Sequence, residues 1–268
     1  MDRLRRENWD VAGLVRTPQT KKLPVGEYFH YAFPSEIDAH AFARPVDILI
    51  HCAFAMRDFD KYQVNREAVA FLKRQPAQRM LFISSMSAHE QAESLYGREK
   101  LYIEKTLDSF DAILRPGFVI GQGGIFRNLA RSIRDAPVIP LFYGGAQPIQ
   151  TVWIDDLSDA VASMIRNGAT GLYSVAEPEP HRIRDFYQAI SEKLGLRKPL
   201  LPLPGIPALW ALKAAESLGI KLPMHSDNLL GLKHLIRRDV RADLARLGLK
   251  PRSMQESLAL IDWAKLAS

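Results

Sequence analysis

Short apolar runs of strand length alternate with helical segments over the first part of the chain. The runs are rich in aliphatic residues: 11–15 (VAGLV), 46–50 (VDILI), 80–84 (MLFIS) and 112–114 (AIL). Such runs are typical of strands that are buried on both faces of a parallel sheet. Residues 64–75 and 96–107, which lie between them, repeat apolar side chains at helical spacing. This alternation predicts βαβ units and therefore an α/β fold with a doubly wound parallel sheet.

The pattern changes near residue 166. A short strand, a helix and a cluster of prolines follow, and residues 228–267 are helical in pattern. We therefore predict two domains in this chain of 268 residues, which is long enough to form both. Residues 1–165 are expected to hold the parallel sheet, and residues 166–268 to form a smaller, more irregular α+β lobe. Residues 121–150 are expected to contribute to that lobe as well.

Composition places the chain among ordinary globular proteins. Hydrophobic residues make up 47% and charged residues 25%, which excludes disordered, collagen-like and low-complexity chains. The lone cysteine, Cys52, excludes a domain held together by internal disulfides. The net charge is +6, yet the basic residues are spread along the chain rather than gathered in one tract. We therefore expect no nucleic-acid partner.

The sequence gives no sign of a membrane segment. No run of about 18 uninterrupted apolar residues occurs, and the N-terminus lacks the apolar core of a signal peptide, so we expect a cytoplasmic protein. Residues 206–222, which include Trp210, could touch a membrane surface. Because Glu216 and Pro223 interrupt this apolar segment, we favour domain packing or pocket lining and expect no membrane partner.

The segment most informative about chemistry is Tyr96-Gly-Arg-Glu-Lys100, which follows two nearby serines, Ser85 and Ser87. Residues four apart on a helix share one face, so the Lys100 ammonium would lie beside the Tyr96 phenol. A cation there favours the phenolate and lowers the pKa of the tyrosine. A serine hydroxyl can bond a substrate oxygen while the tyrosine gives or takes its proton. Together, the tyrosine, the lysine and the serine suit a reaction in which a hydride is transferred to or from a carbinol or carbonyl carbon, with a dinucleotide carrying the hydride.

A tyrosine and a lysine at this spacing are more often a surface pair of a helix, but the surrounding segments strengthen the chemical interpretation. They are VDILIHCAFA (46–55), Asn65 in QVNREA, LFISSMSA (81–88), YGREK (96–100), LRPGFVIGQG (114–123), QPIQTVWIDDLSDAV (147–161) and GLYSVAEPE (171–179). In this order they resemble the NAD-dependent epimerase/dehydratase family, the extended form of the short-chain dehydrogenase/reductase superfamily. The resemblance implies a Rossmann-type domain that binds NAD or NADP and a C-terminal lobe that shapes the substrate pocket.

The resemblance also implies roles for individual residues. Tyr96 would be the acid/base, Lys100 would hold the nicotinamide ribose and tune Tyr96, and Ser85 would position the substrate oxygen. Ser87 is the alternative to Ser85, because Ser-Ser-Met-Ser offers two alignments. The further cofactor contacts that it implies are Arg16, Cys52, Ala53, Pro116 and Gly117. Judged from its neighbours in sequence, Cys52 is better explained as a small core residue, since nothing nearby would lower its pKa.

The chain departs from the family at its N-terminus. The family opens with a strand and a glycine-rich turn whose amides hold the pyrophosphate, and nothing similar precedes Val11. Residues 2–8 are expected to be the end of the first helix, so roughly 20 residues are missing and neighbouring sheet edges lose their partner. Three explanations remain open: a late start or truncation, which we favour, a divergent member that binds the cofactor weakly, or a partner chain that completes the sheet.

Arg16 bears on the choice between the two cofactors. It ends the second strand of the family pattern, where an acidic residue grips the ribose of NAD and an arginine suits the 2′-phosphate of NADP. The residue therefore favours NADP over NAD. The alternative is a solvated arginine at a strand end.

Two functions follow from these observations. We expect an NAD(P)-dependent oxidoreductase or epimerase/dehydratase acting on a hydroxyl or keto group of a small molecule, which is often a nucleotide sugar in this family. The alternative is a non-catalytic dinucleotide-binding sensor or scaffold subunit of the same fold, suggested by the absent glycine-rich turn. No metal site is expected, because the histidines show no ligand spacing. Members of the family often pair through helices of the central domain, so the resemblance also implies a homodimer.

Overall fold

The structure, a computed structural model, describes residues 2–16, 27–55, 62–220 and 224–267. The chain divides into two compact units. The first comprises Met1–Ile83, Tyr102–Leu114 and Val161–Leu172; the second comprises Ser84–Leu101, Arg115–Ala160 and Tyr173–Ser268. Each unit combines stretches that are far apart in the sequence. The domain boundary expected near residue 166 stays a prediction.

The first unit contains the strands and helices that the sequence predicts for a parallel sheet. Its complete elements are α1 (Asp2–Arg6), β1 (Ala12–Val15), β2 (Glu27–Ala32), β3 (Glu36–Ile37), a 3-10 turn (Ala39–Phe42), β4 (Val46–His51), α2 (Tyr62–Leu72) and β5 (Ala77–Ile83). It also holds parts of α3 (Leu95–Glu104), β6 (Ala112–Pro116), α5 (Ile154–Arg166) and β11 (Gly171–Val175). The predicted apolar runs thus become β1, β4, β5 and β6.

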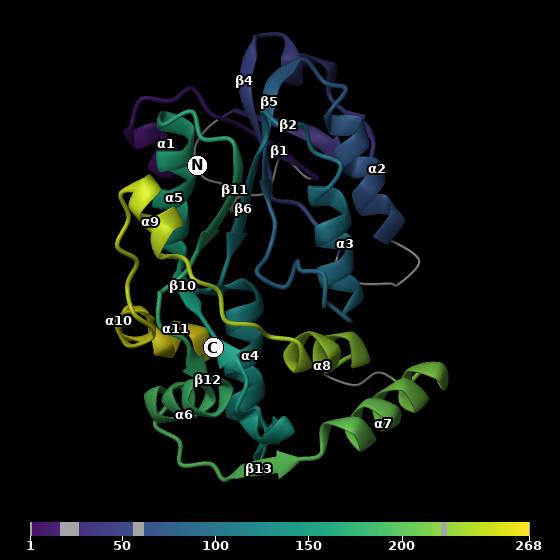
Figure 1. The fold of residues 1–268 in the computed structure, drawn as a ribbon, viewed down its shortest axis with the longest axis vertical. Helices are drawn as coiled ribbons and strands as arrows, with labels where there is room; N and C mark the ends of the chain where they lie inside the picture. The colour runs from purple at the N-terminus through teal and green to yellow at the C-terminus, as the bar shows by residue number, and fades with distance from the viewer. Residues whose placement is uncertain (1, 17–26, 56–61, 221–223, 268) are drawn as a thin grey trace. The chain divides into compact units, whose positions relative to one another are not determined.

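Four strands form the main sheet in the order β11-β6-β5-β4 (Figure 1). β4 and β5 pair in parallel with Leu49 opposite Met80, and β5 and β6 pair in parallel with Leu81 opposite Ala112. Parallel neighbours need a crossover connection, which α2 supplies between β4 and β5 and α3 supplies between β5 and β6. The predicted α/β fold with a parallel sheet is confirmed.

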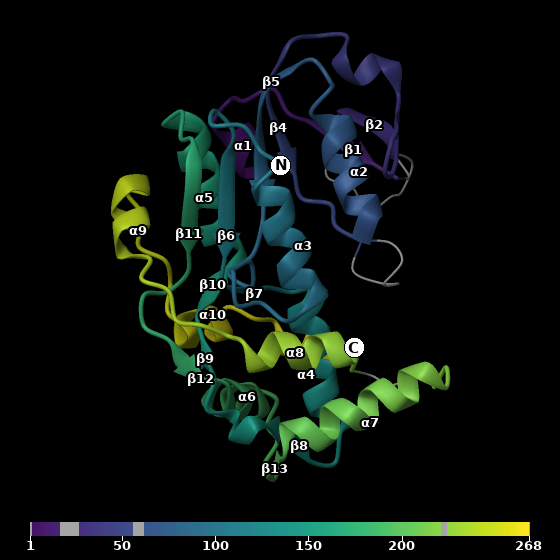
Figure 2. The same ribbon diagram turned by 45° about the vertical axis from the view of Figure 1, so that its right-hand side comes forward.

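Helices cover both faces of this sheet (Figure 2). On one face, Val69 and Leu72 of α2 belong to a buried cluster with Phe82 of β5. On the other face, Ile165 of α5 belongs to a cluster with Ile48 of β4. Neighbouring residues of a strand point to opposite faces, so strands covered on both sides are apolar along their length. This is why the strands could be recognised as continuous apolar runs.

β1 belongs to a separate, smaller sheet. It pairs in parallel with β2, and β2 pairs antiparallel with β3. Within the described ranges, no strand joins β1 to β4.

The second unit is built mainly of helices with short two-stranded sheets. Besides parts of α3, β6, α5 and β11, its elements are β7 (Phe118–Ile120), α4 (Gly124–Asp135), β8 (Ile139–Phe142), a 3-10 turn (Tyr143–Gly145), β9 (Pro148–Ile149), β10 (Thr151–Trp153), β12 (His181–Arg182), α6 (Ile183–Lys193), β13 (Leu200–Leu203), α7 (Gly205–Ser217), α8 (Ser226–Lys233), α9 (Arg241–Leu247), α10 (Met254–Ala259) and α11 (Trp263–Ala267). Its core gathers Phe126, Phe186 and Met254 from α4, α6 and α10. The helical pattern of residues 228–267 becomes four short helices, and Gly248 ends α9 in the left-handed conformation.

α7 differs from the other helices in how little of it is buried. Ile206, Trp210 and Leu218 are 64%, 69% and 75% exposed, so the packing or pocket lining expected for this segment does not occur at these side chains. Residues 221–222, the end of the predicted apolar segment, lie outside the described residues. Within the described part of the chain, no helix is long and apolar enough to cross a membrane.

Candidate functional site

The residues that the sequence singles out for chemistry lie on one loop and one helix of the second unit. Residues 84–94 form the loop, and the Met86 N–H donates to the Pro116 carbonyl at 3.2 Å. Ser94 caps the helix that follows, because its Oγ accepts a bond from the Gly97 N–H at 3.2 Å. This arrangement places Tyr96 in the first turn of α3.

Tyr96 and Lys100 lie on the same side of α3, as their spacing predicts. The Lys100 Nζ is 5.9 Å from the centre of the Tyr96 ring, and Lys100 is only 3% exposed. The Ser85 hydroxyl acts on the Tyr96 phenol as a hydrogen-bonding group that lowers its pKa. The Ser87 N–H donates to the Ser85 Oγ at 3.1 Å. The choice between Ser85 and Ser87 stays a prediction.

The pKa of Tyr96 lies above the ordinary tyrosine value of 10, which is opposite to the direction expected from the sequence. Burial is the main cause, because loss of solvent disfavours the phenolate. The hydrogen bond from Ser85 acts the other way and lowers the pKa, but by less. The expectation that Lys100 makes this phenol acidic is therefore wrong. The phenol stays protonated at neutral pH and can donate its proton.

Gly97 allows the serine loop to lie directly on α3. A Cβ atom at this position would be 2.3 Å from the Ser87 carbonyl oxygen and 3.0 Å from the Ala92 Cβ. A glycine inside a helix makes the helix less stable than an alanine does. The close approach of the Ser87 carbonyl explains why a glycine occurs here nevertheless. Our sequence reasoning missed Gly97, although a glycine within a predicted helix is a recognised signal of close backbone packing.

The N-terminus of α3 is held by a residue from a distant part of the chain. The N–H groups of Leu95 and Tyr96 donate to the two carboxylate oxygens of Asp227, at 2.5 and 3.3 Å. Asp227 lies in the first turn of α8. Nothing in the sequence indicated it, because 131 residues separate it from Tyr96 and only the fold brings the two together.

Pro116 and Gly117, which the resemblance assigns to the cofactor, have contacts within the second unit. The Gly117 N–H donates to the Val175 carbonyl at 3.0 Å. A Cβ on Gly117 would be 2.4 Å from the Gln150 carbonyl oxygen. Backbone packing alone therefore requires a glycine at this position. The role of these two residues at a cofactor stays a prediction.

The other residues assigned to the cofactor belong to the first unit. Arg16 is exposed directly after β1, and Cys52 and Ala53 are exposed directly after β4. The expectation that Cys52 is a core residue is wrong, because the strand has ended and its side chain is exposed. The Asn65 side chain is fully buried and makes two hydrogen bonds to the backbone of Ala55. Its Oδ1 accepts from the Ala55 N–H at 2.7 Å, and its Nδ2 donates to the Ala55 carbonyl at 3.1 Å. These bonds fix the backbone that follows Ala53.

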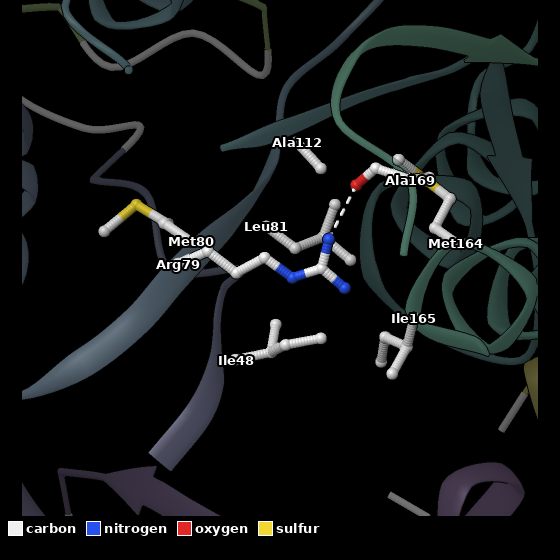
Figure 3. Close-up of a pocket in the computed structure, with 8 residues that line it drawn as sticks. All are labelled: Ile48, Arg79, Met80, Leu81, Ala112, Met164, Ile165 and Ala169. Atoms are coloured by element: carbon white, nitrogen blue, oxygen red, sulfur yellow. Dashed lines mark hydrogen bonds between the residues drawn. The ribbon is translucent and has the colours of Figure 1, made fainter. Parts of the chain in front are cut away.

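Two hollows in the described residues are lined by other side chains. In the first unit, Arg79 and apolar side chains of β4, β5 and α5 line a cavity of about 10 Å³ (Figure 3), which has room for about one water molecule. The Arg79 guanidinium donates to the Ala169 carbonyl at 3.0 Å. In the second unit, residues of α6 and β13 line a groove of about 760 Å³. None of the residues predicted for the site lines either hollow.

No family model matches the sequence, and no curated protein matches it. Solved structures do match the fold. The human epimerase family protein SDR39U1, solved with NADPH, is 14% identical with a TM-score of 0.68, over 96% of this chain and 94% of that chain. TunA, an NAD-dependent NDP-hexosamine 5,6-dehydratase, is 13% identical with a TM-score of 0.68, over 97% of this chain and 91% of that chain.

A third structure of the same kind is the UDP-glucuronic acid 4-epimerase of Bacillus cereus, solved with NAD. It is 15% identical with a TM-score of 0.67, over 99% of this chain and 91% of that chain. At these identities the likeness concerns the fold. The chain has the Rossmann-type fold of NAD-dependent epimerases and dehydratases, as the sequence predicts.

We expect Gly97→Ala to lower the free energy of unfolding by about 1–3 kcal/mol, because the added methyl group overlaps the Ser87 carbonyl. Urea denaturation measures the change. Gly231→Ala in α8 is the matched control, since its Cβ would have only ordinary contacts, 3.9 Å from Ser94. There the better helix propensity of alanine should leave stability unchanged or raise it by up to about 1 kcal/mol. Equal effects of the two substitutions would contradict this account of Gly97.

We expect Tyr96 to ionise only above about pH 10, because its pKa is raised from that value. The measurement is the ultraviolet absorbance of tyrosinate in the wild type minus that in Tyr96→Phe, followed as the pH rises. Ser85→Ala should move the ionisation of Tyr96 to still higher pH, because the hydrogen bond that lowers the pKa is lost. A titration step near neutral pH would show instead that the phenolate is stabilised.

Proposed function

We propose that the chain is an NAD(P)-dependent oxidoreductase or epimerase/dehydratase that acts on a hydroxyl or keto group of a small molecule. One observation carries the proposal: the Lys100 ammonium lies 5.9 Å from the centre of the Tyr96 ring, and the Ser85 hydroxyl lowers the pKa of the same phenol. A hydroxyl, a phenol and an ammonium in this arrangement can hold a substrate oxygen and exchange a proton with it.

The donor set fits the nicotinamide end of a dinucleotide. Lys100 is a buried cation with three N–H donors, which suits the hydroxyls of a ribose. NAD(P), when bound, supplies the hydride donor or acceptor for the reacting carbon. None of the described residues is assigned to the pyrophosphate end of the dinucleotide. Binding of the pyrophosphate therefore needs its own measurement.

Tyr96 moves the proton that accompanies the hydride. In reduction, the carbonyl carbon gains a hydride and the carbonyl oxygen gains the proton of the Tyr96 phenol, so that an alcohol forms. The raised pKa keeps the phenol protonated at neutral pH, which favours this direction. In this proposal, the Ser85 hydroxyl bonds the same oxygen. In oxidation the alcohol proton returns to Tyr96.

The similar structures support a substrate class. TunA is a dehydratase of an NDP-hexosamine, and the Bacillus cereus enzyme is an epimerase of UDP-glucuronic acid. We therefore infer that the small molecule is a nucleotide sugar. Arg16, an exposed cation directly after β1, supports NADP over NAD, because a guanidinium can bond the 2′-phosphate with two N–H groups.

We expect Tyr96→Phe to lower kcat by about 100-fold or more, the usual contribution of a positioned acid, while dinucleotide affinity is unchanged. Steady-state reduction of a panel of keto substrates with NADPH measures this effect. Tyr102→Phe is the matched control, because Tyr102 lies on the same helix but is 46% exposed. Full activity of Tyr96→Phe would exclude this phenol as the acid. A wild-type chain that binds a dinucleotide without any turnover would favour the sensor or scaffold alternative.

We expect Arg16→Ala to weaken NADPH binding by about tenfold or more and to leave NADH binding unchanged, because only NADPH carries the phosphate that a guanidinium bonds. Fluorescence titration of the purified chain with each dinucleotide measures both affinities. Arg74→Ala, which removes another exposed arginine of the first unit, is the control. Equal losses for the two dinucleotides would contradict a role in choosing NADP.

A further inference from the structure

α8 contacts both the start of α3 and the loop before it, although the two segments are far apart in the sequence. Figures 1 and 2 show α8 beside the N-terminal end of α3. At the start of α8, the Asp227 carboxylate accepts the N–H groups of Leu95 and Tyr96 at 2.5 and 3.3 Å. All these residues belong to the second unit.

The other end of α8 contacts the loop itself. The Lys233 Nζ lies 3.1 Å from a carboxylate oxygen of Glu93, and the His234 Nε2 lies 2.9 Å from the other. His89 on the same loop has its Nε2 3.0 Å from the His234 carbonyl oxygen. One end of α8 therefore contacts the first turn of α3, which carries Tyr96, and the other end contacts the loop before it.

The contact of Asp227 with α3 is of a kind that orients a helix end. The first N–H groups of a helix have no partner within the helix. Ser94 satisfies the Gly97 N–H, whereas Asp227 satisfies those of Leu95 and Tyr96. A carboxylate at this end also interacts favourably with the positive end of the helix dipole. Because one of the two donors is the backbone N–H of Tyr96 itself, the carboxylate fixes the residue that carries the phenol.

We infer that Asp227 is a positioning residue for Tyr96, because its carboxylate holds the first turn of α3, which carries the phenol. The inference rests on the proposed function for its catalytic consequence. A proton moves efficiently only when donor and acceptor lie within hydrogen-bond reach, and a small misplacement of a reacting group lowers the rate steeply. Loss of Asp227 therefore lowers kcat rather than raising KM.

The test compares Asp227→Ala and Asp227→Asn with the wild type. The primary measurement is hydrogen exchange of the Leu95 and Tyr96 amides, which needs no turnover. Exchange is expected to be about tenfold faster in Asp227→Ala, which removes both acceptors of the helix end. Asp227→Asn keeps one acceptor oxygen, so its exchange rate is expected to lie between those of the other two.

Asp243→Asn is the matched control, because Asp243 likewise accepts a backbone N–H, that of Ser174 at 2.8 Å, away from α3. It is expected to leave exchange at Leu95 and Tyr96 and the kinetic constants unchanged. In Asp227→Ala, kcat is expected to fall by about tenfold or more, with KM within about twofold of the wild type.

The outcomes separate this inference from the proposed function. Unchanged exchange at both amides in Asp227→Ala overturns the inference, whether or not the protein has activity. Faster exchange with unchanged kcat also overturns it, because the bond then does not position Tyr96 for catalysis. A wild-type chain without turnover contradicts the proposed function, and exchange alone then decides whether Asp227 fixes the turn that bears Tyr96.

Discussion

The candidate site depends on the close approach of one loop to one helix. The Ser87 carbonyl lies so near to α3 that a side chain at Gly97 would overlap it. The same loop carries Ser85, whose hydroxyl lowers the pKa of the Tyr96 phenol. Burial in this contact raises the pKa of Tyr96 more than its hydrogen bond to Ser85 lowers it. The same packing that assembles the site therefore sets the protonation state of its main group.

Residues from the C-terminal part of the chain also contact the loop and the helix of the candidate site. Asp227 satisfies N–H groups at the start of α3, and Lys233 and His234 contact Glu93 on the loop before it. α8 therefore holds the turn that carries Tyr96, so substitutions in this helix can affect Tyr96 through the backbone.

The fold could be predicted from the sequence because its strands are covered on both faces and appear as continuous apolar runs. The position of Tyr96 and Lys100 on one side of a helix could be predicted as well, since helix geometry places residues four apart on the same face. The direction of the Tyr96 pKa shift could not be predicted, because it depends on how much solvent the phenol loses. No local sequence pattern shows this loss. Cys52 was misjudged for a related reason: β4 ends at His51, and the residue that follows is exposed.

By itself, the sequence determined the order of strands and helices, the α/β class and the spacing that puts Tyr96 and Lys100 on one side of a helix. Those features depend on side-chain periodicity and on local backbone geometry. Only the tertiary structure decided that Gly97 must be a glycine and that Asp227 holds the start of α3. Each of these depends on contacts between segments whose approach is set by packing, which local sequence does not record.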